Sequence, residues 1–229
     1  MKVLLFDTET TGLIDKKIDL TYDNLDKFPH IVQLSYVILD VDNYEVIRLY
    51  DTIIKVNNNV FISEENSKIH GITNYISAME GINVKSALFE LLTDIEMADI
   101  VVCHNIEFDL TILNIEIMRL IMNARTGENM REWLKKGIYD ILNIKTKYCT
   151  MKESIELCNI ERENRRGKYL KYPTLTELHN KLFGIIPKKL HNSLNDVLIS
   201  LRCFLKMKYN VDIIEKNNEL KDKIVSLLL

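Results

Sequence analysis

Glycine and proline are scarce in this chain of 229 residues, which contains 7 glycines and 3 prolines. Their scarcity argues against long flexible linkers and predicts one ordinary domain, with insertions at most. None of the four cysteines is in CxxC spacing, so neither a zinc knuckle nor a dithiol redox motif is indicated. No stretch approaches the roughly 20 apolar residues of a membrane span. The apolar start of the chain ends at Asp7, too soon for a signal peptide, so we expect an intracellular, cytoplasmic protein without membrane contact.

A strong positive charge is also absent. The net charge is -3, which is not typical of a protein that coats nucleic acid. A metal-dependent nuclease tolerates that balance, because bound cations supply much of the local positive charge. With 47% hydrophobic and 28% charged residues, the composition is that of a globular protein.

Acidic residues stand at three separate points where an apolar segment meets a break. The three stretches are residues 6–13 (FDTETTGL), 104–109 (HNIEFD) and 191–196 (HNSLND). Together they supply four carboxylates and one histidine: Asp7, Glu9, Asp109, Asp196 and His191. Carboxylate oxygens are the ligands that hard cations such as Mg²⁺ prefer, and a histidine can serve as a general base. The set is typical of two-metal phosphodiester hydrolysis.

The order of these motifs, and the spacing from His191 to Asp196, resemble those of the DEDDh exonucleases. This family includes the bacterial replicative proofreading subunit, ribonuclease T and the three-prime repair exonucleases. The resemblance runs from about Lys2 to about Lys206. It implies an α/β ribonuclease H-like fold, with a mixed sheet of about five strands flanked by helices. It also implies 3′→5′ exonuclease activity with two divalent cations, Mg²⁺ or Mn²⁺, and His191 as the general base. The implied metal ligands are Asp7, Glu9, Asp109 and Asp196.

The resemblance further implies which residues hold the terminal nucleotide. By this resemblance, Leu13 is expected to wedge against the terminal base, and Phe108 is expected to stack on that base. For His70 two interpretations stay open, a wall of the nucleotide pocket or an ordinary surface histidine. The implied substrate-binding residues are Thr10, Thr11, Gly12, Leu13, His70, Asn105 and Phe108.

Each motif also has a purely structural interpretation. Asp7 and Glu9 could form a solvated turn, but residues two apart on an extended strand point the same way and could share a cation. Asp109 could simply stabilise the first turn of a helix through the helix dipole. His191 and Asp196 lie about 140° apart on an ideal helix. They can share a site if His191 lies in the loop before the helix, with Asn192 or the next serine as N-cap.

Hydrophobic periodicity predicts strands first and then alternating helices and strands. In the second strand, the apolar residues are expected on one face and Gln33 and Ser35 on a polar face. His179, on a helix, is expected to be solvated. The predicted strands are residues 3–6, 31–39, 45–56, 100–103 and 147–149. The predicted helices are residues 63–70, 83–97, 108–122, 174–183 and 193–208.

The chain is predicted to consist of an exonuclease domain, residues 1–210, and an amphipathic helical tail, residues 211–229. Insertions are expected near 123–139 and 161–172, the second of them basic. Basic runs are usually solvated faces, but this one could contact substrate phosphates because it lies close to the third motif. We expect the tail to pack on its own domain, because large exposed apolar patches are rare on monomers.

Three alternatives to a DNA 3′→5′ exonuclease stay open. An RNA 3′-trimming exonuclease or oligoribonuclease would use the same catalytic set. Thr10 stands where oligoribonucleases commonly have Met, which favours DNA. An aspartate-nucleophile phosphatase normally needs a second Asp in place of Glu9. A non-catalytic end-binding or polymerase-accessory module would have no need of a general base. The expected partner is a nucleic acid 3′ end, and a DNA polymerase or another replication or repair protein is a further candidate.

Overall fold

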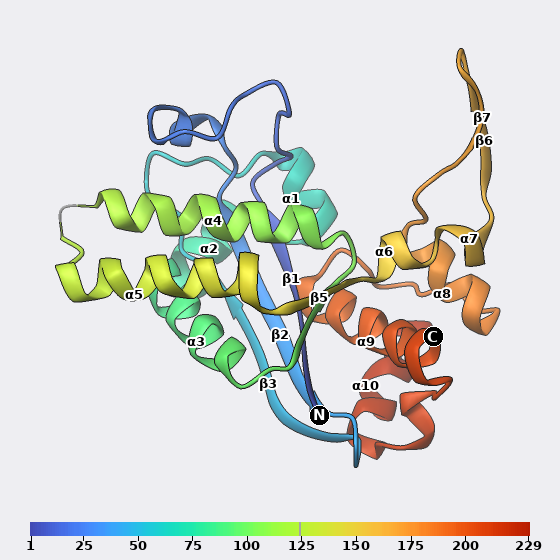
Figure 1. Cartoon of the computed structure of the whole chain (residues 1–229). Coiled ribbons are helices and arrows are strands. Elements are labelled where there is room, and N and C mark those ends of the chain that lie inside the picture. The colour runs from blue at the N-terminus through green and yellow to red at the C-terminus, as the bar shows by residue number, and fades with distance from the viewer. Residues whose placement is uncertain (124) are drawn as a thin grey trace.

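A mixed five-stranded sheet forms the centre of the molecule (Figure 1), with strand order β3-β2-β1-β4-β5. The computed structural model describes residues 1–123 and 125–229, without the side chain of residue 144. β1 is antiparallel to β2 and parallel to β4, β2 is antiparallel to β3, and β4 is parallel to β5. The strands are β1 (Lys2–Thr10), β2 (Ile31–Asp40), β3 (Glu45–Ile53), β4 (Ile100–Cys103) and β5 (Thr146–Cys149). The predicted fold class is confirmed.

Helices cover both faces of this sheet (Figure 1). One face packs on α3, α4 and α5, and the other on α8, α9 and α10. The helices are α1 (Glu64–His70), α2 (Asn74–Glu80), α3 (Val84–Glu96), α4 (Ile106–Met122), α5 (Glu128–Tyr139), α6 (Thr150–Glu153), α7 (Ile155–Cys158), α8 (Leu175–Phe183), α9 (Ser193–Tyr209) and α10 (Asn218–Leu228). Short turns are 3₁₀ (η1, Tyr22–Lys27; η3, Ile213–Glu215) or π (η2, Asp140–Ile144). No helix in the described residues is long and apolar enough to cross a membrane.

Local signals in the sequence determine several helix ends. Ser63 caps α1 by accepting a hydrogen bond from the Asn66 amide, and Gly71 ends that helix with φ +79°. Glycine adopts this left-handed conformation without steric cost. Thr174 and Glu177 form a reciprocal capping box at the start of α8. The predicted helix positions are therefore confirmed to within a few residues.

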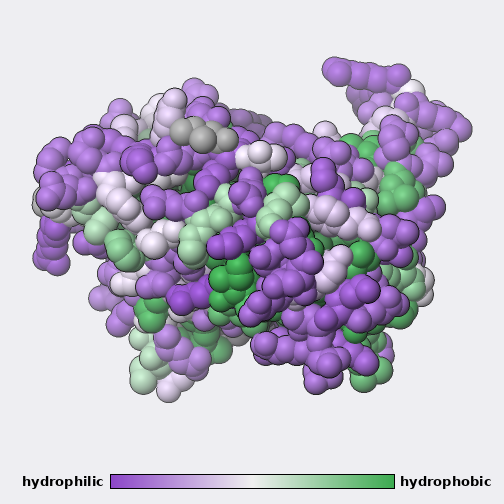
Figure 2. Space-filling view, turned by 60° about the horizontal axis from the view of Figure 1, so that its bottom comes forward, coloured by the Kyte–Doolittle hydropathy of each residue, from purple (hydrophilic) through white to green (hydrophobic). Residues whose placement is uncertain are grey.

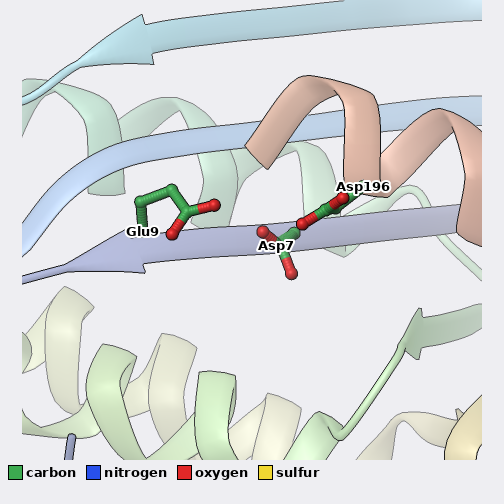
Figure 3. Close-up of side chains that lie close together, drawn as sticks. All are labelled: Asp7, Glu9 and Asp196. Carbon is green, nitrogen blue, oxygen red and sulfur yellow. The ribbon is translucent and has the colours of Figure 1, made fainter. Parts of the chain in front are cut away.

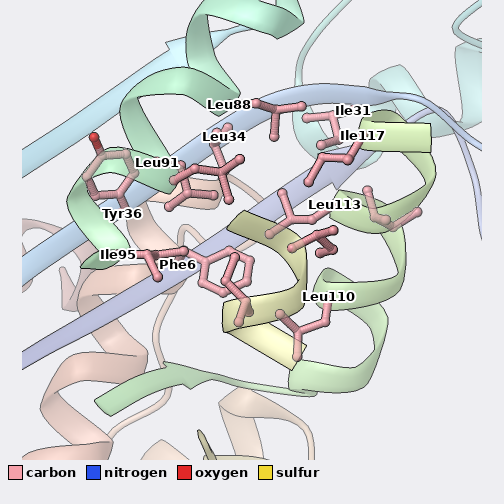
Figure 4. Close-up of a cluster of buried hydrophobic side chains, with 14 of the residues drawn as sticks. Phe6, Ile31, Leu34, Tyr36, Leu88, Leu91, Ile95, Leu110, Leu113 and Ile117 are labelled. Atoms are coloured by element: carbon pink, nitrogen blue, oxygen red, sulfur yellow. The ribbon is translucent and has the colours of Figure 1, made fainter. Parts of the chain in front are cut away.

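The central strands are buried on both sides, and the alternation expected for β2 is confirmed, since Gln33 and Ser35 share one face and Leu34 lies on the other. Gln33 and Ser35 are 3% and 0% exposed, and both side chains donate to Asp51 Oδ1, at 2.8 and 2.6 Å. On the opposite side of the sheet, Phe6 and Leu34 pack against α3 and α4 (Figure 4). This polar face is buried because α9 covers it. Covering of that kind depends on tertiary packing and leaves no trace in local alternation.

The two predicted insertions form regular structure. From Glu128 onward the first one is α5, which packs on α4, with the Phe89 and Trp133 ring centroids 4.9 Å apart. Residue 124 of that predicted insertion lies outside the described residues. The second insertion is a hairpin of β6 (Glu161–Asn164) and β7 (Gly167–Leu170), which forms a separate two-stranded sheet.

The C-terminal segment packs on its own domain. Ile213, Leu220 and Ile224 are fully buried and belong to the same apolar cluster as α9. The Lys188 amide donates to the Leu227 carbonyl at 2.9 Å, so the end of α10 also holds the loop that leads into α9. The packing expected for this tail is therefore observed.

His179 is fully buried, so the expectation of a solvated histidine is wrong. Its Nδ1 lies 2.8 Å from the Ile185 carbonyl and its Nε2 lies 3.0 Å from Arg202 Nη1. Arg202 in turn forms an ion pair with Asp212 at 2.7 Å. The error has a local cause, because His179 is four residues after Leu175 and lies on the apolar face of α8.

Candidate active site

Two carboxylates come from the end of β1, which continues through Thr10 and thus well beyond the predicted end at Phe6. Asp7 and Glu9 are opposite Ser35 and Gln33 of β2, and the register shifts only after Glu9. Because the strand stays extended, both side chains lie on one face. Figure 3 shows them beside Asp196. The geometry expected of this pair is confirmed.

A third carboxylate, Asp196, comes from the first turn of α9. The Asn192 side chain caps this helix by accepting from the Asn195 amide at 3.4 Å. Ser193 Oγ donates to the Asp7 carbonyl at 2.6 Å, and the Ser193 amide donates to Gln33 Oε1 at 3.2 Å. These bonds fix the start of α9 against β1 and β2, and thereby bring Asp196 to the end of β1.

Ligand oxygens of Asp7, Glu9 and Asp196 all lie within 4.8 Å of one another. Asp109, in the first turn of α4, is held beside this group by Thr8. Its Oδ1 accepts from the Thr8 amide at 3.1 Å and from Thr8 Oγ1 at 2.9 Å. Among the described residues, three of the four predicted carboxylates thus form one tight group, and the fourth lies next to it.

Burial raises the pKa of every carboxylate in the site, and repulsion from neighbouring carboxylates raises it further for Asp7, Glu9 and Asp109. Burial is the larger cause, and it raises the pKa of Glu9 to about 8. The pKa values of Asp109 and Asp196 rise to about 7, against hydrogen bonds that lower them. The pKa of Asp7 rises well above its ordinary value, through burial and then repulsion from Asp109, Asp196 and Glu9.

This donor set fits divalent cations. Asp196 Oδ1 is buried and has no hydrogen-bond partner among the described residues, so it is free to coordinate a cation. Clustered carboxylate oxygens are the ligands that Mg²⁺ and Mn²⁺ take. A bound cation would also remove the repulsion that raises the pKa values.

His191 lies in the loop before α9, as predicted, with Asn192 as the N-cap. Its backbone has φ +68°, and its amide donates to Asp196 Oδ2 at 3.3 Å. The residue is exposed and lines a cavity of about 410 Å³ together with Asp7, His104 and Asp196. His191 thus lies at the same cavity as two of the carboxylates, Asp7 and Asp196.

A second and larger cavity, of about 680 Å³, adjoins the first. Asn105 lines both of them, and Leu13 and Phe108 line the larger one. Leu13 is 87% exposed, so its side chain is free to contact a ligand. The sequence analysis assigned no role to the other residues of this wall, which are Ile14, Lys16, Leu20, Glu107, Leu110, Thr111, Asn114 and Leu142.

The remaining predicted substrate residues hold the loop that carries Leu13. Thr10 Oγ1 donates to the Gly12 carbonyl at 2.6 Å, and the His30 amide donates to Thr11 Oγ1 at 2.9 Å. The Asn66 side chain donates to the Thr11 carbonyl. In this structure their hydrogen bonds shape the loop.

His70 is 6% exposed, so the interpretation as a surface histidine is wrong. Its Nδ1 accepts from the Ile72 amide at 3.1 Å. His70 is not among the described residues that line the two cavities. The segment 70–72 is a compact turn after α1, which accounts for the burial of the ring.

His104 is a site residue for which the sequence analysis predicted no role. Its Nδ1 lies 3.0 Å from Thr150 Oγ1 and its Nε2 lies 3.1 Å from the Pro173 carbonyl. A carbonyl only accepts, so Nε2 carries a proton. Burial lowers the pKa of His104 to about 4, so the ring is neutral near neutral pH. The ring ties residues 172–176, a wall of the smaller cavity, to the end of β4.

Fold and site together define a nuclease of the ribonuclease H-like class. A family model described as an exonuclease of the RNase T type matches residues 4–204. The chain therefore belongs to this exonuclease family, and the DEDDh 3′→5′ type that the motifs predict is confirmed.

Solved structures with the same fold include E. coli exonuclease I in complex with a dA16 oligonucleotide. It has a TM-score of 0.54 and 15% identity over 98% of this chain and 43% of its own. Exonuclease I from Methylocaldum szegediense has a TM-score of 0.56 and 14% identity, over 98% of this chain and 45% of its own. A full-length 3′-exonuclease has a TM-score of 0.58 and 13% identity, over 91% of this chain and 60% of its own.

At these identities the likeness establishes the shared fold alone. The chain spans less than half the length of the two exonuclease I proteins. No curated protein sequence matches it closely enough to count as a relative.

Proposed function

We propose that this protein is a metal-dependent 3′→5′ exonuclease that removes nucleoside 5′-monophosphates from single-stranded or frayed DNA ends. One observation carries the proposal. The carboxylates of Asp7, Glu9 and Asp196 gather within 4.8 Å at a cavity that His191 also lines, and an apolar cavity adjoins it.

The acidic group is the place for the cations. Asp7, Glu9 and Asp196, with Asp109 beside them, would hold two Mg²⁺ or Mn²⁺ ions. Such ions, when bound, make a water ligand more acidic and stabilise the charge that develops on a phosphate. The raised pKa values in the site favour this view, because carboxylates that repel one another gain most from a shared cation.

His191 is proposed to take the proton of the attacking water. Its exposed loop position lets the imidazole approach a water at the carboxylates, and histidine is the side chain that most often serves as a general base. The water oxygen bonds to the scissile phosphorus, and the bond from phosphorus to the 3′ oxygen of the preceding nucleotide breaks. A 5′-monophosphate and a shortened strand with a 3′ hydroxyl are the products.

The larger cavity suits the terminal base. Leu13 and Phe108 offer apolar surface and Asn105 offers hydrogen bonds where the two cavities meet. Stacking on an aromatic ring accepts every base, because each base has a π-face. We therefore propose that the terminal nucleotide is held without reading its identity.

DNA is preferred over RNA on two grounds. Thr10 follows Glu9 where oligoribonucleases commonly have Met. The E. coli exonuclease I of the same fold is described in complex with a dA16 oligonucleotide. The RNA 3′-trimming exonuclease is the second candidate, since it would use the same carboxylates and histidine.

One digestion tests the function. DNA and RNA oligonucleotides of equal sequence, each labelled at the 5′ end, are incubated with the protein and Mg²⁺ or with EDTA. A ladder that shortens from the 3′ end, only with Mg²⁺ and faster for DNA, is the expected result. The Asp7→Asn variant is the control for a contaminating nuclease. Faster RNA shortening would select the second candidate, and no shortening of either strand would refute both.

A further inference from the structure

The hairpin of β6 and β7, called the basic arm here (residues 161–170), projects from the body of the domain beside α7 and α8 (Figure 1). It forms a sheet of its own, and every residue in it except Leu170 is exposed. In Figure 2 the projection at the upper right is almost entirely purple, hence hydrophilic. A two-stranded hairpin without an apolar face adds little stability to a domain, so its surface is the feature to explain.

The charge of this arm is opposite to that of the chain. The arm and the residue that follows it, Lys171, carry five basic and two acidic side chains, in a chain with net charge -3. Lys168 and Lys171 pair with Glu161 and Glu177, at 3.3 and 2.7 Å. In the described part of the chain, no carboxylate forms an ion pair with the arm's three arginines, which are Arg162, Arg165 and Arg166.

The two faces of the arm differ. Cross-strand register places Arg162 opposite Tyr169, and directly opposite residues of an antiparallel pair share a face. The other face carries Glu163 opposite Lys168, so its charges compensate each other. The first face thus presents a cation and a 46% exposed aromatic ring, with two more arginines at the tip. The guanidinium group of arginine binds phosphate through bidentate hydrogen bonds, and an aromatic ring stacks on bases.

The arm leads directly into the active site. Tyr169 is three residues before Tyr172, which lines the smaller cavity together with Asp7 and His191. Three extended residues span about 10 Å, and the six or seven from Tyr172 to the tip arginines span roughly 20–24 Å. At about 3.4 Å per nucleotide of a stacked strand, these distances correspond to about three to seven nucleotides.

We propose that the arginine face of the basic arm binds the phosphates of the substrate strand about three to seven nucleotides before its 3′ end. This inference rests on the proposed function and names a second contact for the same substrate. The arm makes binding depend on strand length, because only a strand longer than about three nucleotides reaches it. It does not read sequence, since phosphate contacts carry no base information.

The test compares a long and a minimal substrate. The arm variant replaces Arg162, Arg165 and Arg166 with Ala. Its control replaces three exposed lysines of the C-terminal segment, Lys216, Lys221 and Lys223, with Ala, so that both variants lose the same charge. Steady-state kinetics with Mg²⁺ use a 20-nucleotide oligothymidylate and the p-nitrophenyl ester of thymidine 5′-monophosphate. Anisotropy of the labelled 20-mer in EDTA measures binding separately.

For the arm variant we expect KM on the 20-mer to rise on the order of 10–100-fold at 0.1 M salt, with kcat and ester hydrolysis unchanged. The slope of log affinity against log salt should shrink by about 2, since each phosphate contact on a single strand contributes about 0.7. Equal effects of the arm and control variants would overturn the inference, and so would equal loss on both substrates. If the wild type hydrolyses neither substrate, the proposed function fails. In that case the arm inference stands or falls on the anisotropy difference alone.

Discussion

Replacing Asp196 by Asn should stabilise the cation-free protein while it destroys the site. The pKa of Asp196 is about 7 in the fold, against an ordinary value of 3.8. A raised carboxyl pKa means that the folded state favours the protonated form. The stability that this contributes is complete below pH about 4, and it is lost as the pH rises through about 7. The amide of the Asp196→Asn variant cannot ionise, so the variant escapes that loss at pH 8.

The difference of about 3 between the folded and the ordinary pKa of Asp196 sets an upper bound of about 4 kcal/mol on the gain in unfolding free energy. Asp7 and Glu9 share the same repulsion and the group is partly solvated, so the expected gain is about 1–3 kcal/mol. For a domain of this size, that gain in stability corresponds to a Tm increase of roughly 2–10 °C at pH 8 in EDTA. At pH 5 the difference in stability should be only about two fifths of that at pH 8, because the stability is lost steadily between the unfolded pKa of 3.8 and the folded pKa of about 7.

Thermal unfolding is followed by circular dichroism at pH 5 and pH 8, in EDTA and in Mg²⁺. Mg²⁺ should raise the Tm of the wild type at pH 8 and raise that of Asp196→Asn much less, because one ligand is gone. Asp222→Asn, on the exposed side of α10, is the matched control and should behave as wild type. A variant that is no more stable than wild type at pH 8 in EDTA would refute the electrostatic argument for this cluster.

Three further variants test other parts of the molecule. His191→Ala should lower kcat on the order of 10²–10⁴-fold, the usual contribution of a general base, and a kcat close to that of the wild type would place the base elsewhere. Phe108→Ala should weaken single-strand binding by about 1–3 kcal/mol equally for all four terminal bases, whereas loss for one base alone would contradict stacking. Ile224→Ala, within the α10 contact, should cost roughly 2–5 kcal/mol of stability with kcat preserved, and undiminished stability would show that α10 contributes little.

Much of the fold follows from local sequence signals. The apolar run after Lys2, the Ser63 and Thr174 caps and Gly71 determine where elements begin and end, and the helix ends among them match the prediction to within a few residues. These signals act between residues close in the chain, through capping bonds and backbone preferences. The carboxylates and His191 could be selected for a similar reason, since each sits where an element meets a loop.

Tertiary structure alone decided how those residues meet. β1 stays extended past Phe6 because β2 pairs with it, and only that pairing keeps Asp7 and Glu9 on one face. Gln33, 160 residues away from Ser193, fixes the start of α9 and so the place of Asp196. The solvated interpretation of His179 and the surface interpretation of His70 were wrong for the same reason, because burial depends on what packs against a residue. Contacts between residues far apart in the chain have no local pattern in it, and the site consists of such contacts.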